Sequence, residues 1–98
     1  MTERDYILTT IKSHKPDLLK YGIRLIGLFG SYARNEQSDN SDIDILIDFD
    51  PEEENFDNYM AVCDLIENLF GKRKTEIVTK NGLSQYIGPK ILNEVIYV

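Results

Sequence analysis

One stretch of the chain, residues 27–49, restricts its possible folds more than any other. It begins in an apolar run that ends at Gly30-Ser31, continues through ten mostly polar residues, and closes with a second apolar run that opens on Asp42 and Asp44. Side chains alternate between the two faces of a β-strand, so both aspartates share one face, about 7 Å apart along the chain. The isoleucines between and after them take the opposite face. We therefore predict two strands joined by a polar crossover, with the second strand anchored in the core.

The two ends of this stretch carry residue types suited to a metal-bound polyphosphate. Asp42 and Asp44 can converge on one or two divalent cations, and Mg²⁺ is usually held by one or two carboxylates together with substrate phosphates. Gly30 lacks a Cβ and lets the backbone approach a ligand closely. Ser31 supplies a hydroxyl where a short helix is expected to begin, and the free N–H groups of a helix start favour phosphate. Each feature alone is typical of an ordinary strand or turn, and their combination favours a functional site.

The same residues resemble a known family. Gly30-Ser31, ten further residues and Asp42-Ile43-Asp44 match the Gly-Ser-x10-Asp-x-Asp pattern of the DNA polymerase β-like nucleotidyltransferases. The fuller runs, Gly30 to Arg34 and Ser41 to Ile47, resemble more narrowly the minimal nucleotidyltransferases, called MNT or MntA-type proteins. These proteins are often encoded beside a HEPN-domain toxin. The resemblance extends from about Ile23 to the C-terminus.

The resemblance implies an enzyme that transfers a nucleotidyl group from ATP with the help of Mg²⁺, two ions being expected. Asp42 and Asp44 are then the metal ligands that bridge to the triphosphate. Gly30 and Ser31 are expected to hold the terminal phosphates, which leave as pyrophosphate. Arg34 is expected to contact a phosphate, although an exposed helix position also explains an arginine there.

A third carboxylate completes the site in the polymerase β-like family, as an aspartate on the neighbouring strand. The matching residue in this chain is Glu76. Glutamate reaches about one methylene farther, and a displacement near 1 Å can cost about 10²-fold in rate. We expect Glu76 to ligate a metal and to position or deprotonate the acceptor hydroxyl, with an exposed strand-edge residue as the alternative. Asp48 shares the face of Asp42 and Asp44 but lies about 13 Å beyond Asp44 along the strand, too far for the same cations.

The rest of the pattern predicts a small mixed β-sheet flanked by helices, an α/β (α+β) protein with the polymerase β-like nucleotidyltransferase fold that the resemblance implies. A length of 98 residues suits one minimal domain over residues 1–98. Apolar side chains at helical spacing in residues 56–70, including Phe56, Met60 and Cys63, predict a core-facing stripe. We expect strands at 23–29, 42–49 and 75–79, and helices at 3–14, after Pro16, at 31–36, at 56–70 and from Pro89 to about Val95.

Composition narrows the class of partner. The net charge of −6 argues against direct binding of nucleic acid. The run Lys72 to Lys74 is a local exception, which either meets a phosphate or is a solvated loop. There is no apolar run of the roughly 20 residues that a membrane span needs, and the polar N-terminus is unlike a secretory signal. We therefore expect a cytoplasmic protein.

The acceptor is expected on another protein, because the chain has no residues left for an acceptor domain. The resemblance implies a HEPN-family toxin, a ribonuclease silenced by adenylylation of a tyrosine, with this chain as its antitoxin in a hetero-oligomer. A second hypothesis is an antitoxin that neutralises the toxin by binding alone, which Glu76 and the acidic charge both favour. A third is a subunit that modifies a small molecule or a nucleic acid.

Overall fold

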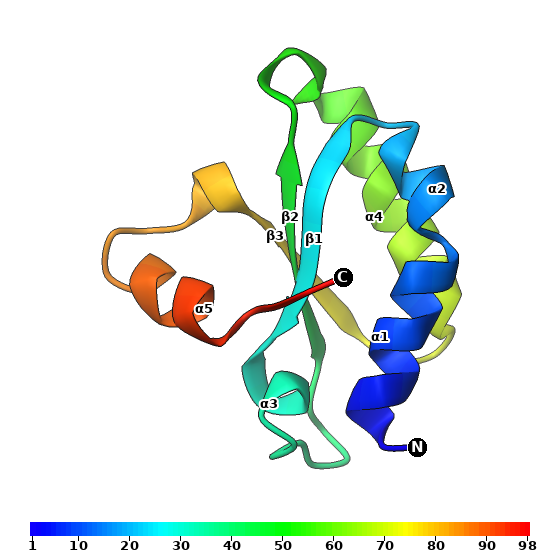
Figure 1. The fold of residues 1–98 in the computed structure, drawn as a ribbon, viewed down its shortest axis with the longest axis vertical. Coiled ribbons are helices and arrows are strands. Elements are labelled where there is room, and N and C mark those ends of the chain that lie inside the picture. The colour runs from blue at the N-terminus through cyan, green and yellow to red at the C-terminus, as the bar shows by residue number, and fades with distance from the viewer.

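A four-stranded sheet runs through the centre of the computed structural model, which describes residues 1–98 (Figure 1). In chain order the elements are α1 (Glu3–Ser13), α2 (Lys15–Leu19), β1 (Ile23–Phe29), α3 (Gly30–Ala33), β2 (Ile43–Phe49), the 3-10 turn η1 (Pro51–Glu53), α4 (Phe56–Phe70), β3 (Thr75–Thr79), the 3-10 turn η2 (Lys80–Gly82), α5 (Gly88–Glu94) and β4 (Ile96–Tyr97).

The sheet is mixed, as the sequence predicts, with the strand order β3-β2-β1-β4. β1 is antiparallel to both β2 and β4, whereas β2 and β3 are parallel. Parallel neighbours need a long crossover, and α4 supplies it between β2 and β3. The predicted α+β class is confirmed.

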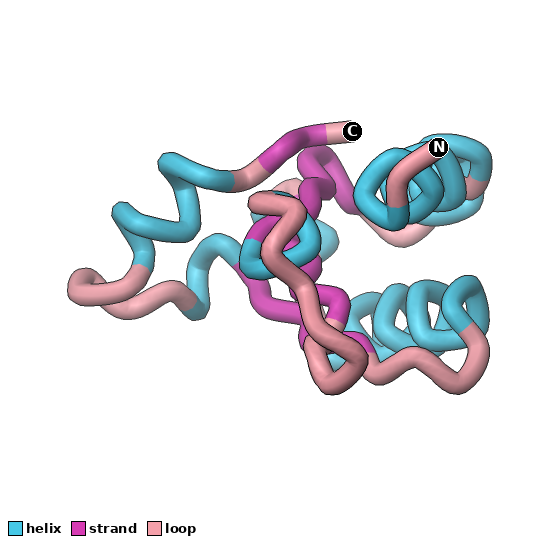
Figure 2. The backbone as a smooth tube through the Cα atoms, turned by 90° about the horizontal axis from the view of Figure 1, so that it is seen from below, coloured by secondary structure: helices cyan, strands magenta, loops and turns pink.

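The two faces of the sheet are covered unequally. Helices α1, α2 and α4 lie on one face and α5 lies on the other (Figures 1 and 2). The isoleucine face of β2 is fully buried under the three helices, as predicted. The opposite face carries a smaller cluster of three buried residues, Phe29, Leu46 and Ile91. Since Asp44 alternates with the isoleucines, it lies on the face that α5 only partly covers.

Capping residues and glycines mark the ends of the helices. The Thr2 hydroxyl accepts a hydrogen bond from the Asp5 backbone N–H at 3.0 Å and caps α1. The chain leaves α2 through Gly22 and α4 through Gly71, both with a positive φ. Left-handed backbone is accessible to glycine without steric cost. The helices predicted over residues 3–14 and 56–70 are confirmed.

Three local expectations differ from the structure. β2 begins at Ile43, one residue later than predicted, so Asp42 precedes the strand. α3 ends at Ala33 instead of residue 36 and is a single turn. The buried face of α4 is rotated from the predicted stripe. Its buried residues include Cys63, as predicted, but Met60 is 40% exposed. Met60 lies roughly 120° around the helix from the buried Ile66, which places it outside the face that meets the sheet.

The expected core position of Phe56 is also wrong. Phe56 is 75% exposed because it occupies the first residue of α4, where no further turn packs beside it.

None of the helices is long and apolar enough to cross a membrane.

The fourth strand, β4, was not predicted. It pairs with β1 through Gly27 with Tyr97 and Leu28 with Ile96, and the Val98 N–H donates to the Ile26 carbonyl at 2.9 Å. The approach is close because Gly27 has no side chain. A Cβ at this position would lie 2.6 Å from Val95 Cγ2 and 2.9 Å from the Ile96 carbonyl oxygen. This strand fixes the chain directly after α5, and so positions the C-terminal end of that helix.

We predict that Gly27→Ala lowers the free energy of unfolding by about 1–3 kcal/mol, the usual cost of forcing atoms into a filled site. The backbone of β4 has to move, because one of the two close contacts is a main-chain oxygen. Urea denaturation measures the change. Gly88→Ala is the control, since Gly88 has no positive φ and a Cβ there would meet nothing nearer than Leu83 Cβ at 3.3 Å. Equal stability of Gly27→Ala and the native chain would contradict this packing.

Candidate active site

The sheet register brings the predicted site residues into one row. Phe29 pairs with Asp44 across β1 and β2, and Asp44 pairs with Glu76 across β2 and β3. Gly30 follows Phe29 directly, so Gly30, Asp44 and Glu76 lie side by side across three strands. The row sits where β1 ends and where β2 and β3 begin. Residues separated by almost fifty positions in the sequence thus meet because one strand, β2, lies between the other two.

Gly30 is held against Asp44 by its backbone conformation. Its φ is +78°, and a Cβ there would lie 2.1 Å from Asp44 Oδ2. Either feature alone favours glycine, and together they exclude any side chain at this position. Ser31 follows within the single turn of α3, where its carbonyl accepts a hydrogen bond from the Glu36 N–H at 2.9 Å. The structure therefore places Gly30 directly beside Asp44, with Ser31 following it in the chain.

The carboxylate of Asp44 carries the clearest electrostatic signature of the site. Partial burial raises its pKa from the ordinary value to about 6, and the negative charge of Glu76 and a hydrogen bond with it add to the shift. The charges of Asp42 and Glu94 act in the same direction. Like charges that are brought together disfavour ionisation. The side chains of Asp42, Glu76 and Glu94 are therefore close enough to Asp44 to affect its ionisation.

This excess of negative charge fits a divalent cation. Asp42, Asp44 and Glu76 offer oxygen ligands, which Mg²⁺ prefers. A cation beside Asp44 would relieve the repulsion that raises the pKa of this carboxyl group. No three acidic, histidine or cysteine side chains stand at metal-ligating distances, so the carboxylates have to turn toward a shared ion. The metal-binding roles of the three residues stay predictions.

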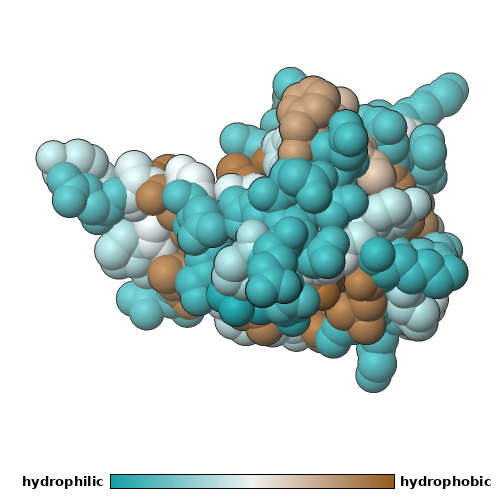
Figure 3. Space-filling model, turned by 90° about the horizontal axis from the view of Figure 1, so that it is seen from above, coloured by the Kyte–Doolittle hydropathy of each residue, from teal (hydrophilic) through white to brown (hydrophobic).

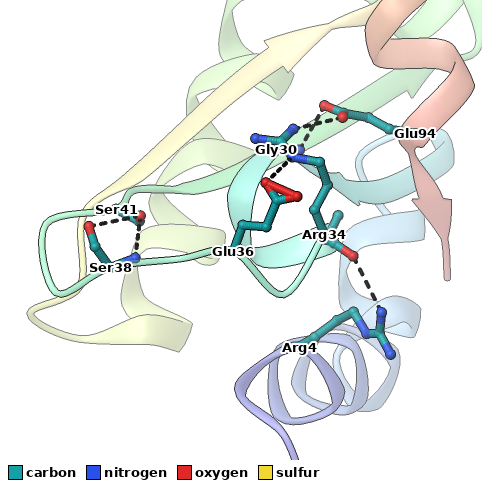
Figure 4. A network of polar contacts seen from close by, with 8 residues as sticks. Arg4, Gly30, Arg34, Glu36, Ser38, Ser41 and Glu94 are labelled. Atoms are coloured by element: carbon teal, nitrogen blue, oxygen red, sulfur yellow. Dashed lines mark hydrogen bonds and ion pairs between the residues drawn. The ribbon is translucent and has the colours of Figure 1, made fainter.

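Arg34 and Glu94 form a second polar arrangement beside Gly30 (Figure 4). The Gly30 N–H donates to Glu94 Oε1 at 3.0 Å, and Arg34 Nη1 donates to Glu94 Oε2 at 2.7 Å. Arg34 also lies 3.4 Å from the Glu36 carboxylate. The hydrogen bond with Glu94 is the main reason that the pKa of Arg34 is raised. Nothing in the sequence distinguishes Glu94, because an acidic residue at the end of a short helix is normally a surface residue.

A polar cleft of about 640 Å³ opens beside Asp42. One wall is the loop 37–41 between α3 and β2, and the other is the basic run Lys72 to Lys74 before β3. The Ser38 N–H donates to the Ser41 hydroxyl at 2.9 Å and closes the loop on itself. Arg73 forms an ion pair with Glu3. The basic run thus lies beside Asp42 in the candidate site. This proximity could not be seen from the sequence.

Asp48 is separate from this site. It is 3% exposed, and its carboxylate accepts a hydrogen bond from Arg24 Nε at 2.9 Å. A buried charge needs such a partner. Asp48 is therefore part of the structural framework near the far end of β2, which agrees with its exclusion on distance alone.

Known proteins share this fold and are similar to this chain in sequence. Residues 7–98 match the family model described as a nucleotidyltransferase domain. The protein adenylyltransferase MntA of Thermococcus cleftensis is 36% identical over 99 residues, covering 100% of this chain and 98% of the relative. A solved structure assigned as a minimal nucleotidyltransferase is 27% identical with a TM-score of 0.72, covering 91% of this chain and 93% of that one. A mutant of the toxin-antitoxin MntA-HpeT has a TM-score of 0.62, covers 98% of this chain and 71% of that one, and at 16% identity supports the fold alone.

The chain therefore belongs to the nucleotidyltransferase domain family and is a minimal nucleotidyltransferase of the MNT type. The predicted class of enzyme, a nucleotidyltransferase, is confirmed.

We predict that Asp44→Asn stabilises the metal-free protein at pH 7.5 by on the order of 1 kcal/mol, a figure reduced for solvent screening at a partly exposed group. The folded state holds the Asp44 proton more tightly than the unfolded state, so stability falls as pH rises toward about 6. The penalty is complete above that pH and disappears below about 4, near the ordinary pKa of an aspartate. Urea denaturation in EDTA between pH 4 and 8 measures it.

Asp64→Asn is the matched control, because Asp64 is exposed on the outer side of α4. It shows the effect of removing one surface carboxylate under the same conditions. A stability difference for Asp44→Asn that does not change between pH 4 and 8 would contradict the crowding of carboxylates around Asp44.

Proposed function

We propose that this nucleotidyltransferase moves AMP from ATP to a hydroxyl group of a partner protein. The proposed acceptor is a tyrosine of a HEPN-type toxin, and the chain is its antitoxin. The observation that carries the proposal is the row of Gly30, Asp44 and Glu76 across three adjacent strands. It supports a reaction centre in which Asp44 on β2 lies between groups from the β1 side and the β3 side.

The roles follow from that order. Asp42, Asp44 and Glu76 would hold Mg²⁺, which neutralises triphosphate charge and polarises the reacting phosphoryl group when bound. The Gly30 N–H, the Ser31 hydroxyl and the Arg34 guanidinium would bind the terminal phosphates. Charge-assisted hydrogen bonds of this kind are short and strong. The chain then acts mainly by positioning the triphosphate and by stabilising its charge.

The position of Glu76 suits a group that accepts the acceptor proton. An in-line displacement puts the attacking and the leaving oxygens on opposite sides of the reacting phosphorus. Glu76 on β3 and Gly30 directly after β1 lie on opposite sides of Asp44 on β2. The leaving pyrophosphate would be held on the β1 side, and the acceptor hydroxyl would arrive on the β3 side.

A protein acceptor is supported by the relatives. The Thermococcus cleftensis relative is described as a protein adenylyltransferase. The polar cleft beside Asp42 is open to solvent, so a side chain of another protein can approach this proposed metal ligand. The net charge of −6 favours a basic partner through complementary charge.

A second candidate is an antitoxin that binds its toxin without modifying it. Two observations favour this function. Glu76 stands where the family pattern has an aspartate, and the three carboxylates do not form a ready metal site. Under this alternative the fold would be retained as a binding surface.

We predict that co-expression with the protein encoded beside this gene, the proposed toxin, adds whole adenylyl increments to the intact mass of that protein. The increments should be absent with Asp42→Asn/Asp44→Asn, because these substitutions remove two carboxylates and leave the side-chain volume nearly unchanged. Intact-mass spectrometry reads the nucleotide, the number of transfers and, after fragmentation, the acceptor residue. An unmodified toxin that co-purifies with the native chain and loses its toxicity would instead establish the binding-only antitoxin.

A further inference from the structure

We propose that the Glu94 carboxylate occupies the position of the terminal phosphates in the nucleotide-free protein, and that ATP binds by displacing it. This inference rests on the proposed function, because it concerns the same phosphate position. It goes beyond that function by assigning Glu94 a role in nucleotide affinity, with an effect that depends on whether the ligand carries a polyphosphate.

The contacts of Glu94 are those expected of a bound phosphate. One oxygen accepts a hydrogen bond from the Gly30 N–H at 3.0 Å and the other accepts one from Arg34 at 2.7 Å (Figure 4). These two donors are the ones proposed above for the triphosphate. A carboxylate and a phosphate both present anionic acceptor oxygens. They cannot use the same donors in the same geometry at the same time, so one has to leave when the other binds.

Charge makes the two states exclusive. The Glu94 side chain is 18% exposed and lies close enough to Asp44 to raise the pKa of that carboxyl group. Arg34 is the cation that Glu94 contacts. A polyphosphate that takes Arg34 would leave the Glu94 charge unpaired among three other carboxylates. Repulsion therefore favours movement of Glu94 away from the site once a nucleotide is bound.

The fold allows this movement at modest cost. Glu94 is the last residue of α5, a helix of seven residues. α5 lies apart from the main helical layer, on the side where Figure 3 shows a lobe projecting from the rest of the surface. Its anchor on the sheet is the small cluster of Phe29, Leu46 and Ile91. Segments with few buried apolar contacts open at low free energy. Because β4 fixes the chain directly beyond Glu94, the Glu94 side chain leaves its donors by rotating about its own bonds, and the rest of α5 can loosen while the C-terminal strand stays paired.

Glu94 thereby links ligand type to affinity. Apparent affinity is reduced by the fraction of molecules in which the binding position is free. The apparent affinities for ATP and pyrophosphate are lowered in this way, because both ligands compete with Glu94 for the Gly30 and Arg34 donors. AMP has neither terminal phosphate, so Glu94 does not oppose its binding in the same way. Return of Glu94 to its donors would also favour the release of pyrophosphate.

Titration calorimetry of Glu94→Gln with Mg-ATP, Mg-pyrophosphate and AMP tests the proposal. Glutamine keeps the shape of the side chain and removes its charge. We expect the Kd for Mg-ATP and for pyrophosphate to fall about tenfold, the scale of one charge-assisted contact, and the Kd for AMP to change less than twofold. Glu36→Gln is the matched control, because Glu36 also pairs with Arg34 but is 65% exposed at its side chain. It should leave all three ligands within twofold of the native chain.

Weaker Mg-ATP binding by Glu94→Gln, or an equal change for ATP and AMP, would overturn the proposal and make Glu94 a support for Arg34. Failure of both the native chain and Glu94→Gln to bind Mg-ATP would instead overturn the proposed function, and this inference with it. Amide hydrogen exchange of the native chain gives an independent test. Mg-ATP should slow exchange in residues 27–34 and accelerate it in residues 88–94, and slower exchange in both segments would contradict displacement.

Discussion

The site depends above all on the position of β2 between β1 and β3. Its isoleucine face is fully buried under α1, α2 and α4, and this burial fixes the register of the strand. A slip of one residue would turn the isoleucines away from the three helices and place Asp44 against them, so the hydrophobic effect opposes it. The same register places Asp44 between Phe29 and Glu76. The energy that holds the core together therefore also holds three chemically active positions in one row.

This arrangement concentrates negative charge, and other groups of the site partly neutralise it. The pKa of Asp44 rises because the carboxylate is partly buried among other acidic groups. Arg34 and the Gly30 N–H satisfy one of these groups, Glu94, without any ligand. The proposed cation and polyphosphate site thus has part of its charge neutralised by its own side chains. Under the proposal, nucleotide binding replaces contacts that already exist, so affinity depends on the residues that are displaced.

Local and periodic signals predicted most of the framework. Alternation in residues 43–49, helical spacing in 56–70 and the cap at Thr2 each depend on neighbours within a few positions. The motif from Gly30 to Asp44 predicted the family and the proximity of these residues. Glu94 escaped prediction because its partners are 60 and 64 residues away in the sequence. β4 escaped because two paired residues carry little periodic signal, and their pairing requires a glycine in a distant strand.

The most direct test of the account is the transfer of label from α-phosphate-labelled ATP to the purified toxin by the native chain, Glu76→Asp and Glu76→Gln. The account predicts label on the toxin with the native chain. It predicts a loss of about 10²-fold or more with Glu76→Gln, the usual contribution of a proton-accepting side chain. Glu76→Asp, which keeps the carboxylate, should retain more activity than Glu76→Gln. Equal transfer by the native chain and Glu76→Gln would contradict the row of Gly30, Asp44 and Glu76 as the reaction centre.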